Sequence, residues 1–295
     1  MIEPLEYSRK GPLLLFTHAN GYPPESYKTF LNPLLPDYQV KALYLRPFWP
    51  EANPDSVSDW RVFRDDYLHY LEKLDSDLKD SELEMNHAGG IIAVGHSVGA
   101  MTSLLAAIKR PELFRALVLI EPVLFPPLVG LLMRMAAPFQ TLRRVHPLIR
   151  RTLWRRVAFP GREEMFRNYR GKPIFARLSD QVLRDYISGL VSDMPDGSVT
   201  LKYSPAWEMR IYETSGIADG YVWRNLPKIP CPVLVLRGEK SDTLKARVVW
   251  LMEKLLRNGQ VFTLPDTGHL APLEAPSRTA QLVSEFLDSV KRDTF

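Results

Sequence analysis

Ser97 is the residue of this chain whose surroundings point most directly to chemistry. It lies in the pentapeptide 95–99 (Gly-His-Ser-Val-Gly), between the apolar run 91–94 and a helix-like stretch over 101–109. A Gly-x-Ser-x-Gly pattern between a buried strand and a helix predicts a very tight turn that exposes the serine hydroxyl. Glycines fit such a turn because a Cβ would clash in it, and the helix directs its first N–H groups toward the same place. We therefore expect Ser97 to act as a nucleophile.

A serine hydroxyl needs a base, a group that orients the base, and donors for the developing oxyanion. His269 follows the expected strand 261–264, and Asp242 follows the expected strand 233–236. The chain order serine, aspartate, histidine, each after a separate strand, matches a Ser-His-acid triad. Because the carboxyl ends of parallel strands share one edge of a sheet, we expect the three loops to converge.

Different interpretations of these residues stay open. A lone histidine after a strand is often a packing residue, and Asp242 could cap a helix that begins near Thr243. Glu121 and Glu239 are competing acids, and Glu121 follows a strand from which a side chain can also reach the histidine. We rank Asp242 first as the acid of the triad and Glu121 second.

The elements expected to position these residues alternate between apolar strands and helices. Strands are predicted over 13–17, 39–45, 91–94, 116–120, 233–236 and 261–264, and helices over 25–35, 56–78, 101–109, 243–256 and 276–290. Continuous apolar strands that alternate with helices indicate a mostly parallel sheet covered on both faces. About ten residues precede the first strong strand, which leaves room for one additional strand.

The alternation breaks over residues 123–225, which contain prolines, arginines and amphipathic helical pieces but no convincing buried strand. We predict a helical cap insertion over this range, leaving the sheet above Ser97, and a core made of residues 1–122 and 226–295. The stretch 123–135 is strongly apolar, and a plain buried helix is its simplest interpretation.

Cap helices over such a site also commonly line an acyl pocket. The candidate substrate-binding residues are therefore Leu128 and Met133 of the insertion, together with Tyr22 from the loop after the first strong strand.

Four motifs in this order resemble the α/β-hydrolase superfamily: residues 17–21 (Thr-His-Ala-Asn-Gly), the pentapeptide 95–99, the Asp242 loop, and the Gly-His pair 268–269. They are most similar to capped serine hydrolases with a His-Gly-x motif in the first loop. The resemblance implies an α/β-hydrolase fold, in which a mostly parallel twisted sheet has helices on both faces and carries a helical cap.

The resemblance also bears on the oxyanion hole. One donor is expected to be the backbone N–H of Val98, the residue after the nucleophile. The match to the first loop implies that the second is the backbone N–H of Asn20. Ala19 stands where many relatives have glycine, so the sequence leaves open whether Ala19 or Asn20 supplies that amide.

Composition limits the class of protein. The 295 residues, 45% of them hydrophobic, predict one large packed domain or a core with an inserted module. No apolar run approaches the ~18 residues needed to span a bilayer, and the acidic N-terminus does not resemble a signal peptide. The single cysteine, Cys231, excludes an internal disulfide. We expect a cytoplasmic protein without stable membrane insertion.

The net charge of +4 is unevenly distributed, because residues 122–210 contain 15 Lys/Arg and 7 Asp/Glu. A basic patch can bind nucleic acid, anionic lipid or an anionic substrate, but a solvated helical surface is the simpler interpretation. No nucleic-acid motif, metal-ligand spacing or dinucleotide-binding Gly-x-Gly-x-x-Gly accompanies it. We expect no nucleic-acid partner, no metal and no cofactor.

Dehalogenases and epoxide hydrolases of this fold use an aspartate nucleophile, so a serine at position 97 disfavours both. We expect a serine hydrolase that cleaves an ester-type bond through an acyl-serine, with a carboxylesterase acting on a small to medium apolar molecule as the first choice. A C–C bond hydrolase, a lactonase, a thioesterase and an acyltransferase are the second choices. A non-catalytic binding protein is a further possibility, against which the complete set Ser97, Asp242 and His269 argues.

Overall fold

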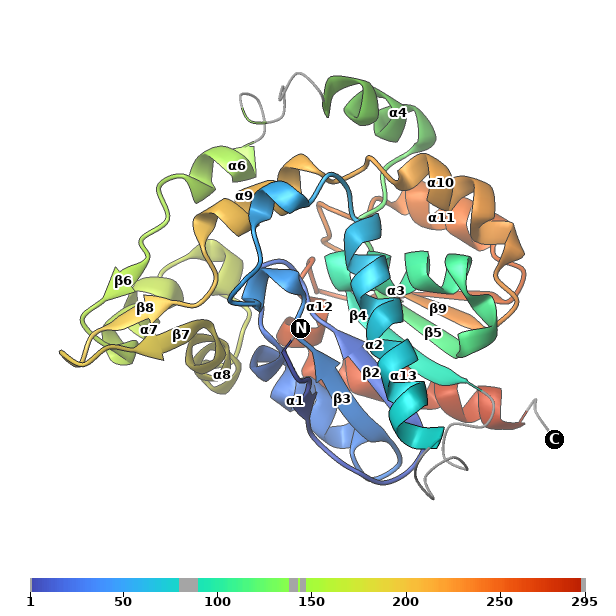
Figure 1. Cartoon of the computed structure of the whole chain (residues 1–295), viewed down its shortest axis with the longest axis horizontal. Helices are drawn as coiled ribbons and strands as arrows, with labels where there is room; N and C mark the ends of the chain where they lie inside the picture. The colour runs from blue at the N-terminus through green and yellow to red at the C-terminus, as the bar shows by residue number, and fades with distance from the viewer. Residues whose placement is uncertain (1, 80–89, 138–142, 144–146, 293–295) are drawn as a thin grey trace.

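The computed structural model of the chain describes residues 2–79, 90–137, 143 and 147–292. Its main feature is a seven-stranded sheet with the order β1-β3-β2-β4-β5-β9-β10 (Figure 1). The strands are β1 (Leu5–Glu6), β2 (Leu13–Thr17), β3 (Gln39–Leu43), β4 (Ile91–His96), β5 (Phe114–Ile120), β9 (Val233–Gly238) and β10 (Gly259–Leu264). β1 pairs with β3 in the antiparallel direction and all other pairs are parallel, so the predicted mostly parallel sheet is confirmed.

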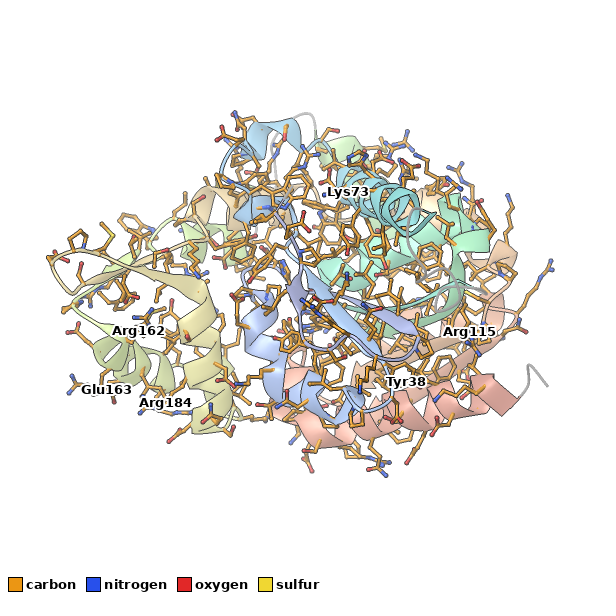
Figure 2. All side chains as sticks on the ribbon, turned by 60° about the horizontal axis from the view of Figure 1, so that its bottom comes forward. Tyr38, Lys73, Arg115, Arg162, Glu163 and Arg184 are labelled. Atoms are coloured by element: carbon orange, nitrogen blue, oxygen red, sulfur yellow. The ribbon has the colours of Figure 1, made fainter. Side chains whose placement is uncertain are left out.

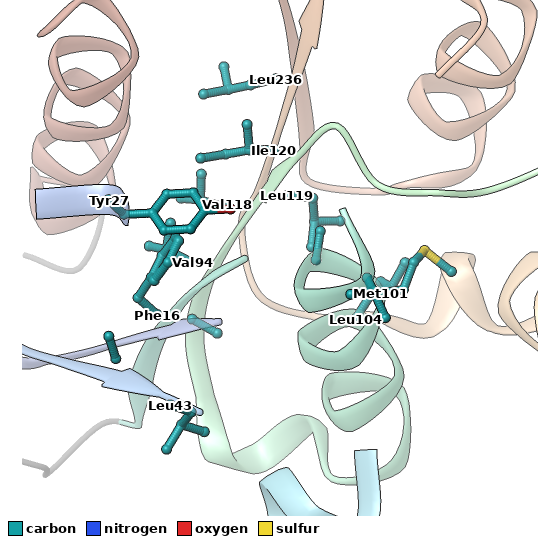
Figure 3. Packing of buried hydrophobic residues seen from close by; sticks show 14 of the residues in the cluster. Phe16, Tyr27, Leu43, Val94, Met101, Leu104, Val118, Leu119, Ile120 and Leu236 are labelled. Carbon is teal, nitrogen blue, oxygen red and sulfur yellow. The ribbon is translucent and has the colours of Figure 1, made fainter. Parts of the chain in front are cut away.

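Helices cover both faces of this sheet, which explains why β2 and β4 are buried at every position. Successive side chains of a strand point to opposite faces. In Figure 3, Val118 and Ile120 of β5 lie on the side of Tyr27, whereas Leu119 lies on the side of Met101. The continuous apolar runs in the sequence therefore follow from burial on both faces.

The helices around the core sheet are short near the N-terminus and mostly longer after it, although α12 has only four residues. They include η1 (Pro24–Tyr27), α1 (Lys28–Leu31), η2 (Asn32–Leu34), α2 (Arg61–Lys79), α3 (Val98–Lys109), α11 (Ala246–Leu255), α12 (Ala271–Glu274) and α13 (Pro276–Arg292). α2 begins later than predicted, because residues 54–56 form a separate 3₁₀ turn and the Asp59 carboxylate accepts a hydrogen bond from the N–H of Arg61 (2.7 Å).

The insertion (residues 123–225) contributes no strand to the seven-stranded sheet among its described residues. Its helices are α4 (Pro127–Ala136), α6 (Pro147–Thr152), α7 (Arg162–Arg170), α8 (Asp180–Leu190), α9 (Pro205–Glu213) and α10 (Asp219–Asn225). The insertion also contains a small antiparallel sheet of β6 (Ala158–Phe159), β8 (Val199–Leu201) and β7 (Val191–Asp193). None of these short strands is buried along its whole length, and the sequence did not predict them. The division of the chain into a core and a cap domain stays a prediction.

These strands could not be predicted from the sequence, because two or three residues are too few to show the alternation of apolar and polar side chains that marks a strand. The turn that joins β7 to β8 carries the sequence signal that was available for this hairpin, an Asp196-Gly197 pair in which Gly197 has φ +83°.

At the outer edge of the insertion, Arg184 and Glu163 form an ion pair between α8 and α7 (2.8 Å; Figure 2).

Helix α9 attaches the insertion to the core, and helix α10 holds the first residues of the insertion itself. From α9, Arg210 donates to the carbonyl of Val57 (2.7 Å), and the Ile211 carbonyl accepts from the indole of Trp60 (3.2 Å). α10 holds the backbone of Phe125 by both of its polar groups. The Phe125 N–H donates to the Asp219 carboxylate (2.8 Å), and the Phe125 carbonyl accepts from the indole of Trp223 (2.8 Å).

Because the Asp219 carboxyl is buried, we expect the free energy of unfolding to depend on pH. Burial raises its pKa to about 7, against the smaller lowering effect of the hydrogen bond from Phe125. An unfolded aspartate has a pKa of about 3.9, so between about pH 4 and pH 7 the unfolded chain loses a proton that the folded chain keeps. Stability should therefore fall as pH rises through this window, and Asp219→Asn should remove that part of the fall.

The measurement is urea unfolding of the wild type and of Asp219→Asn at about pH 5 and about pH 8. We expect the wild-type midpoint to fall more than that of the variant. Glu253→Gln, which removes an exposed carboxylate on α11, is the control and should keep the wild-type pH slope. Equal slopes for the wild type and Asp219→Asn would contradict the prediction.

Candidate active site

Ser97 occupies the turn between β4 and α3 in a backbone conformation that is rare for a residue with a side chain. Its φ is 58° and its ψ is −119°. The Ser97 N–H donates to the carbonyl of Ile120 at the end of β5 (3.0 Å), which fixes the turn against the sheet. A strained conformation of this kind persists only where the surrounding structure enforces it.

The flanking glycines are required by close approach of the backbone. A Cβ on Gly95 would lie 2.6 Å from the backbone nitrogen of Ala100, and one on Gly99 would overlap the carbonyl oxygen of Thr17. The tight strand–turn–helix arrangement predicted from the pentapeptide is therefore the one observed.

His269 lies between the serine and a carboxylate. Its Nε2 is 3.0 Å from Ser97 Oγ, and its Nδ1 is 3.0 Å from Glu121 Oε2. The histidine comes from the loop after β10 and keeps 23% of its side chain exposed, whereas Glu121, directly after β5, is fully buried. Ser97, His269 and Glu121 thus form one chain of hydrogen bonds.

Asp242 is not the acid in contact with His269, and this part of the prediction needs correction. The Asp242 side chain is exposed and accepts a hydrogen bond from the hydroxyl of its neighbour Thr243 (3.2 Å). The turn after β9 directs Ser241 inward in its place, and Ser241 Oγ donates to Glu121 Oε2 (2.6 Å). The acid ranked second from the sequence, Glu121, therefore occupies the position expected for Asp242.

Glu121 is a buried carboxylate that accepts three hydrogen bonds. The donors are His269 Nδ1, the Ser241 hydroxyl and the backbone N–H of Gly238 (2.6 Å). Because an ionised carboxylate only accepts, its contact with His269 requires the proton on Nδ1, which leaves Nε2 free to accept from the Ser97 hydroxyl. Gly238 has no room for a Cβ, which would overlap the carbonyl of Gly268 in the histidine loop.

The loop after β2 approaches the same place with two backbone amides in different roles. The Ala19 N–H donates to the hydroxyl of Tyr27 (3.1 Å). Within the described residues, no hydrogen bond uses the backbone N–H of Asn20 or of Val98. Of the two amides between which the sequence does not decide, that of Asn20 is therefore the one without a competing acceptor.

The Asn20 side chain is held by the insertion. Its Nδ2 donates to the carbonyl of Glu208 in α9 (3.3 Å), and its Oδ1 accepts from the hydroxyl of Tyr203. Glu208 also forms an ion pair with Arg155. Charged and aromatic side chains of the insertion therefore hold the loop that contains Asn20. No sequence pattern indicated this contact, because 183 or more residues separate its partners.

His96 joins three loops of the site. Its Nε2 lies 2.8 Å from the backbone oxygen of His269, and its Nδ1 lies 2.7 Å from the Tyr27 hydroxyl. A carbonyl can only accept, so Nε2 carries the proton and Nδ1 accepts from Tyr27. Burial lowers the pKa of His96 well below its ordinary value, in accord with a neutral ring. Ala19, Tyr27, His96 and His269 are thus joined by consecutive hydrogen bonds.

His18 supports the first loop in a similar way. Its Nδ1 donates to the carbonyl of Ala19 (2.8 Å), and its Nε2 accepts from the N–H of Leu45 (3.0 Å). Burial lowers the pKa of His18 to about 4, so the ring is neutral at physiological pH. Both its nitrogens are in use, as expected for a histidine that supports a loop.

The three candidate substrate residues lie in different surroundings. Tyr22 is half-buried and stacks on Tyr186 of α8, with ring centroids 4.8 Å apart. Met133 packs its sulfur against Gly216. Leu128 is 68% exposed on α4, so it does not line an enclosed pocket in this structure. No group of three or more potential metal ligands occurs among the described residues.

Comparisons with known proteins show the family to which the chain belongs. A family model described as the alpha/beta hydrolase family matches residues 14–282. The abhydrolase domain-containing protein AKT2 of Alternaria alternata is 27% identical over 234 residues, which cover 68% of this chain and 84% of that protein. Ethanol acetyltransferase 1 of Hanseniaspora uvarum is 24% identical over 250 residues, covering 80% of this chain and 67% of that protein.

The same fold is found in the crystal structure of E-2-(acetamidomethylene)succinate hydrolase. That structure superposes with a TM-score of 0.72 at 20% sequence identity, covering 96% of this chain and 93% of the other. Since the family model extends over most of the sheet and the whole insertion, this chain belongs to the alpha/beta hydrolase family.

Proposed function

We propose that the protein hydrolyses a carboxylic ester through an acyl-serine, with Ser97 as nucleophile, His269 as general base and acid, and Glu121 as the acid that orients the histidine. The observation that carries the proposal is the continuous chain from Ser97 Oγ through both ring nitrogens of His269 to Glu121, with 3.0 Å at each step. Its members come from three different strand ends, which is the recurring design of such triads.

In the first half-reaction, the Ser97 hydroxyl transfers its proton to His269 Nε2 as its oxygen attacks the ester carbonyl. The imidazolium that forms is stabilised by the Glu121 carboxylate at Nδ1. The backbone N–H groups of Asn20 and Val98 donate to the developing oxyanion. Collapse of the tetrahedral intermediate breaks the carbon–oxygen bond, and His269 gives its proton to the leaving alcohol.

In the second half-reaction, a water attacks the acyl-serine and transfers a proton to His269 Nε2. Collapse of this second intermediate releases the carboxylic acid, and the proton returns to Ser97. A water is consumed, one ester bond is broken, and the enzyme regains its starting protonation. His96 keeps its own proton throughout, because its Nε2–H is already donated to the His269 backbone.

Transfer of the acyl group to an alcohol is the second candidate function. The similarity to an ethanol acetyltransferase along 80% of this chain supports it. Hydrolysis and transfer share the acyl-serine and differ only in the acceptor. Adding ethanol to a p-nitrophenyl acetate assay and measuring acetate and ethyl acetate separates them, because a hydrolase yields acetate as the main product.

The first catalytic prediction concerns the nucleophile and the base. Ser97→Ala and His269→Ala should each lower kcat for p-nitrophenyl acetate roughly 10³-fold or more, and the double variant should lose little further, because the two residues act as one unit. A Ser97→Ala protein that keeps more than about a tenth of the wild-type rate would contradict the assignment, provided that labelling by a fluorophosphonate is also retained.

The second catalytic prediction separates the two acids. Glu121→Gln should lower kcat by on the order of 10⁴-fold, because the neutral amide no longer enforces the proton on Nδ1 or stabilises the imidazolium. Asp242→Asn is the matched control and should keep a rate near wild type, since this side chain is exposed.

Thermal unfolding of both variants shows whether the fold is kept. Ser241→Ala adds an intermediate case, because it removes one donor to Glu121 and leaves His269 in contact. We expect its loss in kcat to be about tenfold or less. Normal rates in Glu121→Gln together with collapse in Asp242→Asn would restore the acid predicted first from the sequence.

The third catalytic prediction concerns substrate choice by the insertion. Tyr22 follows the Asn20 loop by two residues and stacks on Tyr186, so this pair is the aromatic contact between the oxyanion loop and α8. We expect Tyr22→Ala and Tyr186→Ala to raise KM for longer acyl chains more than for acetate, by about fourfold for each CH₂ that loses burial.

Leu128→Ala is the comparison, because the exposed Leu128 should leave the chain-length profile unchanged. The measurement is kcat and KM with a series of p-nitrophenyl esters from acetate to octanoate. A profile that responds to Leu128 and not to the tyrosines would contradict the prediction.

A further inference from the structure

Helix α4 presents an apolar face to solvent. Leu128, Leu131, Leu132 and Met135 are exposed, and their spacing of three and four residues places them on one side of the helix. The opposite side carries Gly130, which is buried against Asp219. The usual pattern of a surface helix, with its apolar side inward and its polar side outward, is therefore not followed here.

Exposed apolar side chains continue at α6 and just after it. Leu148 and Leu153 are exposed, and Trp154 exposes 90% of its surface. Both α4 and α6 lie along the upper edge of the molecule in Figure 1. Large apolar side chains gathered on the outside of a protein mark a surface that meets another phase or another molecule.

The charges of the same segment have one sign. Residues 122–162 contain eight arginines and neither aspartate nor glutamate. Arg134, Arg150 and Arg151 are exposed, and no ion pair between described residues involves them. Nearby arginines of the insertion do find partners, as Arg155 does with Glu208 and Arg156 with Glu164 (3.1 Å). The unpaired arginines thus lie beside the exposed apolar side chains.

We propose that this apolar–arginine face, formed by α4, α6 and Trp154, binds the surface of an anionic lipid bilayer. The leucines, Met135 and Trp154 would enter the boundary between headgroups and acyl chains, while the arginines contact lipid phosphates. Binding is peripheral: within the described residues, no helix has the length and apolar character needed to cross a bilayer. The proposal does not depend on acyl chemistry.

The positive charge of the apolar–arginine face argues against a second copy of this chain as the partner that binds there. A two-fold contact places the same patch of both subunits face to face, so Arg134, Arg150 and Arg151 would meet their own copies. Like charges that meet across an interface are costly, whereas phosphate headgroups complement every arginine on the face. An exposed tryptophan next to arginines also suits a membrane–water boundary, where indole rings are enriched.

The test is co-flotation of the full chain with phosphatidylcholine vesicles that contain no or about 30% phosphatidylglycerol, at about 50 mM and about 500 mM salt. We expect binding to the anionic vesicles at low salt and weaker binding at high salt. Ser97→Ala should bind like the wild type, so a failure of the proposed catalytic function would not be mistaken for a failure of this proposal.

Two pairs of variants separate the apolar and the charged contributions. Leu131→Ser/Leu132→Ser should lower the partition coefficient tenfold or more, as expected from about 0.8 kcal/mol per buried CH₂. Ile174→Ser is the control for Leu132, because the two side chains are 57% and 56% exposed and Ile174 lies between α7 and α8. It should not change binding.

Arg150→Gln/Arg151→Gln should lower the partition coefficient about 25-fold, because each basic residue near an anionic surface contributes about a factor of five. Lys245→Gln/Arg247→Gln, at the exposed start of α11, is the matched control. Lack of flotation with anionic vesicles, or unchanged binding in both test variants, would overturn the proposal. So would a wild-type dimer in sedimentation velocity that Leu131→Ser/Leu132→Ser dissociates, since the face would then be an interface between copies.

Discussion

The geometry of the site depends on one buried carboxylate, Glu121. It directly follows β5, accepts from the backbone at the end of β9, and contacts the histidine of the loop after β10. A buried carboxylate without donors is strongly unfavourable, so the loops that supply its three hydrogen bonds are tied to its position. Gly238 lets two of these loops approach closely enough, since any side chain there would overlap the carbonyl of Gly268. The orientation of His269 is therefore fixed by the folding of three strand ends.

A second set of hydrogen bonds fixes the other side of the histidine. Tyr27 accepts from the Ala19 amide and donates to His96, which in turn donates to the His269 backbone. In this arrangement the amide of Ala19 donates to Tyr27, whereas no hydrogen bond between described residues uses the amide of Asn20. Both ring nitrogens of His96, the residue before Ser97, are used in these hydrogen bonds. Tyr27 and His96 thus connect the loop after β2 with the loop that carries His269.

The parts predicted well from the sequence are those set by local pattern. The strands over 13–17 and 261–264, the Ser97 turn and the loop position of His269 follow from apolar runs and from glycines that a tight turn requires. The choice of acid did not follow, because Glu121 and Asp242 both lie in loops that follow a strand. Which one faces the histidine depends on the turn after β9, where Ser241 rather than Asp242 points inward. No periodicity encodes that difference.

The contacts of the insertion, like the choice of acid, could not be predicted from local sequence patterns. Its contacts with the site join residues far apart in the chain, such as the Asn20 side-chain amide with the carbonyl of Glu208. Through α9 the insertion holds the loop that carries the Asn20 N–H, and through α10 it holds the backbone of Phe125, four residues after Glu121. Helix α4 packs on α10 where Gly130 meets Asp219, and the same Asp219 carboxylate holds the N–H of Phe125. If the bilayer is the occupant of the outer face of α4, α10 is therefore the element that connects this face with the segment directly after Glu121.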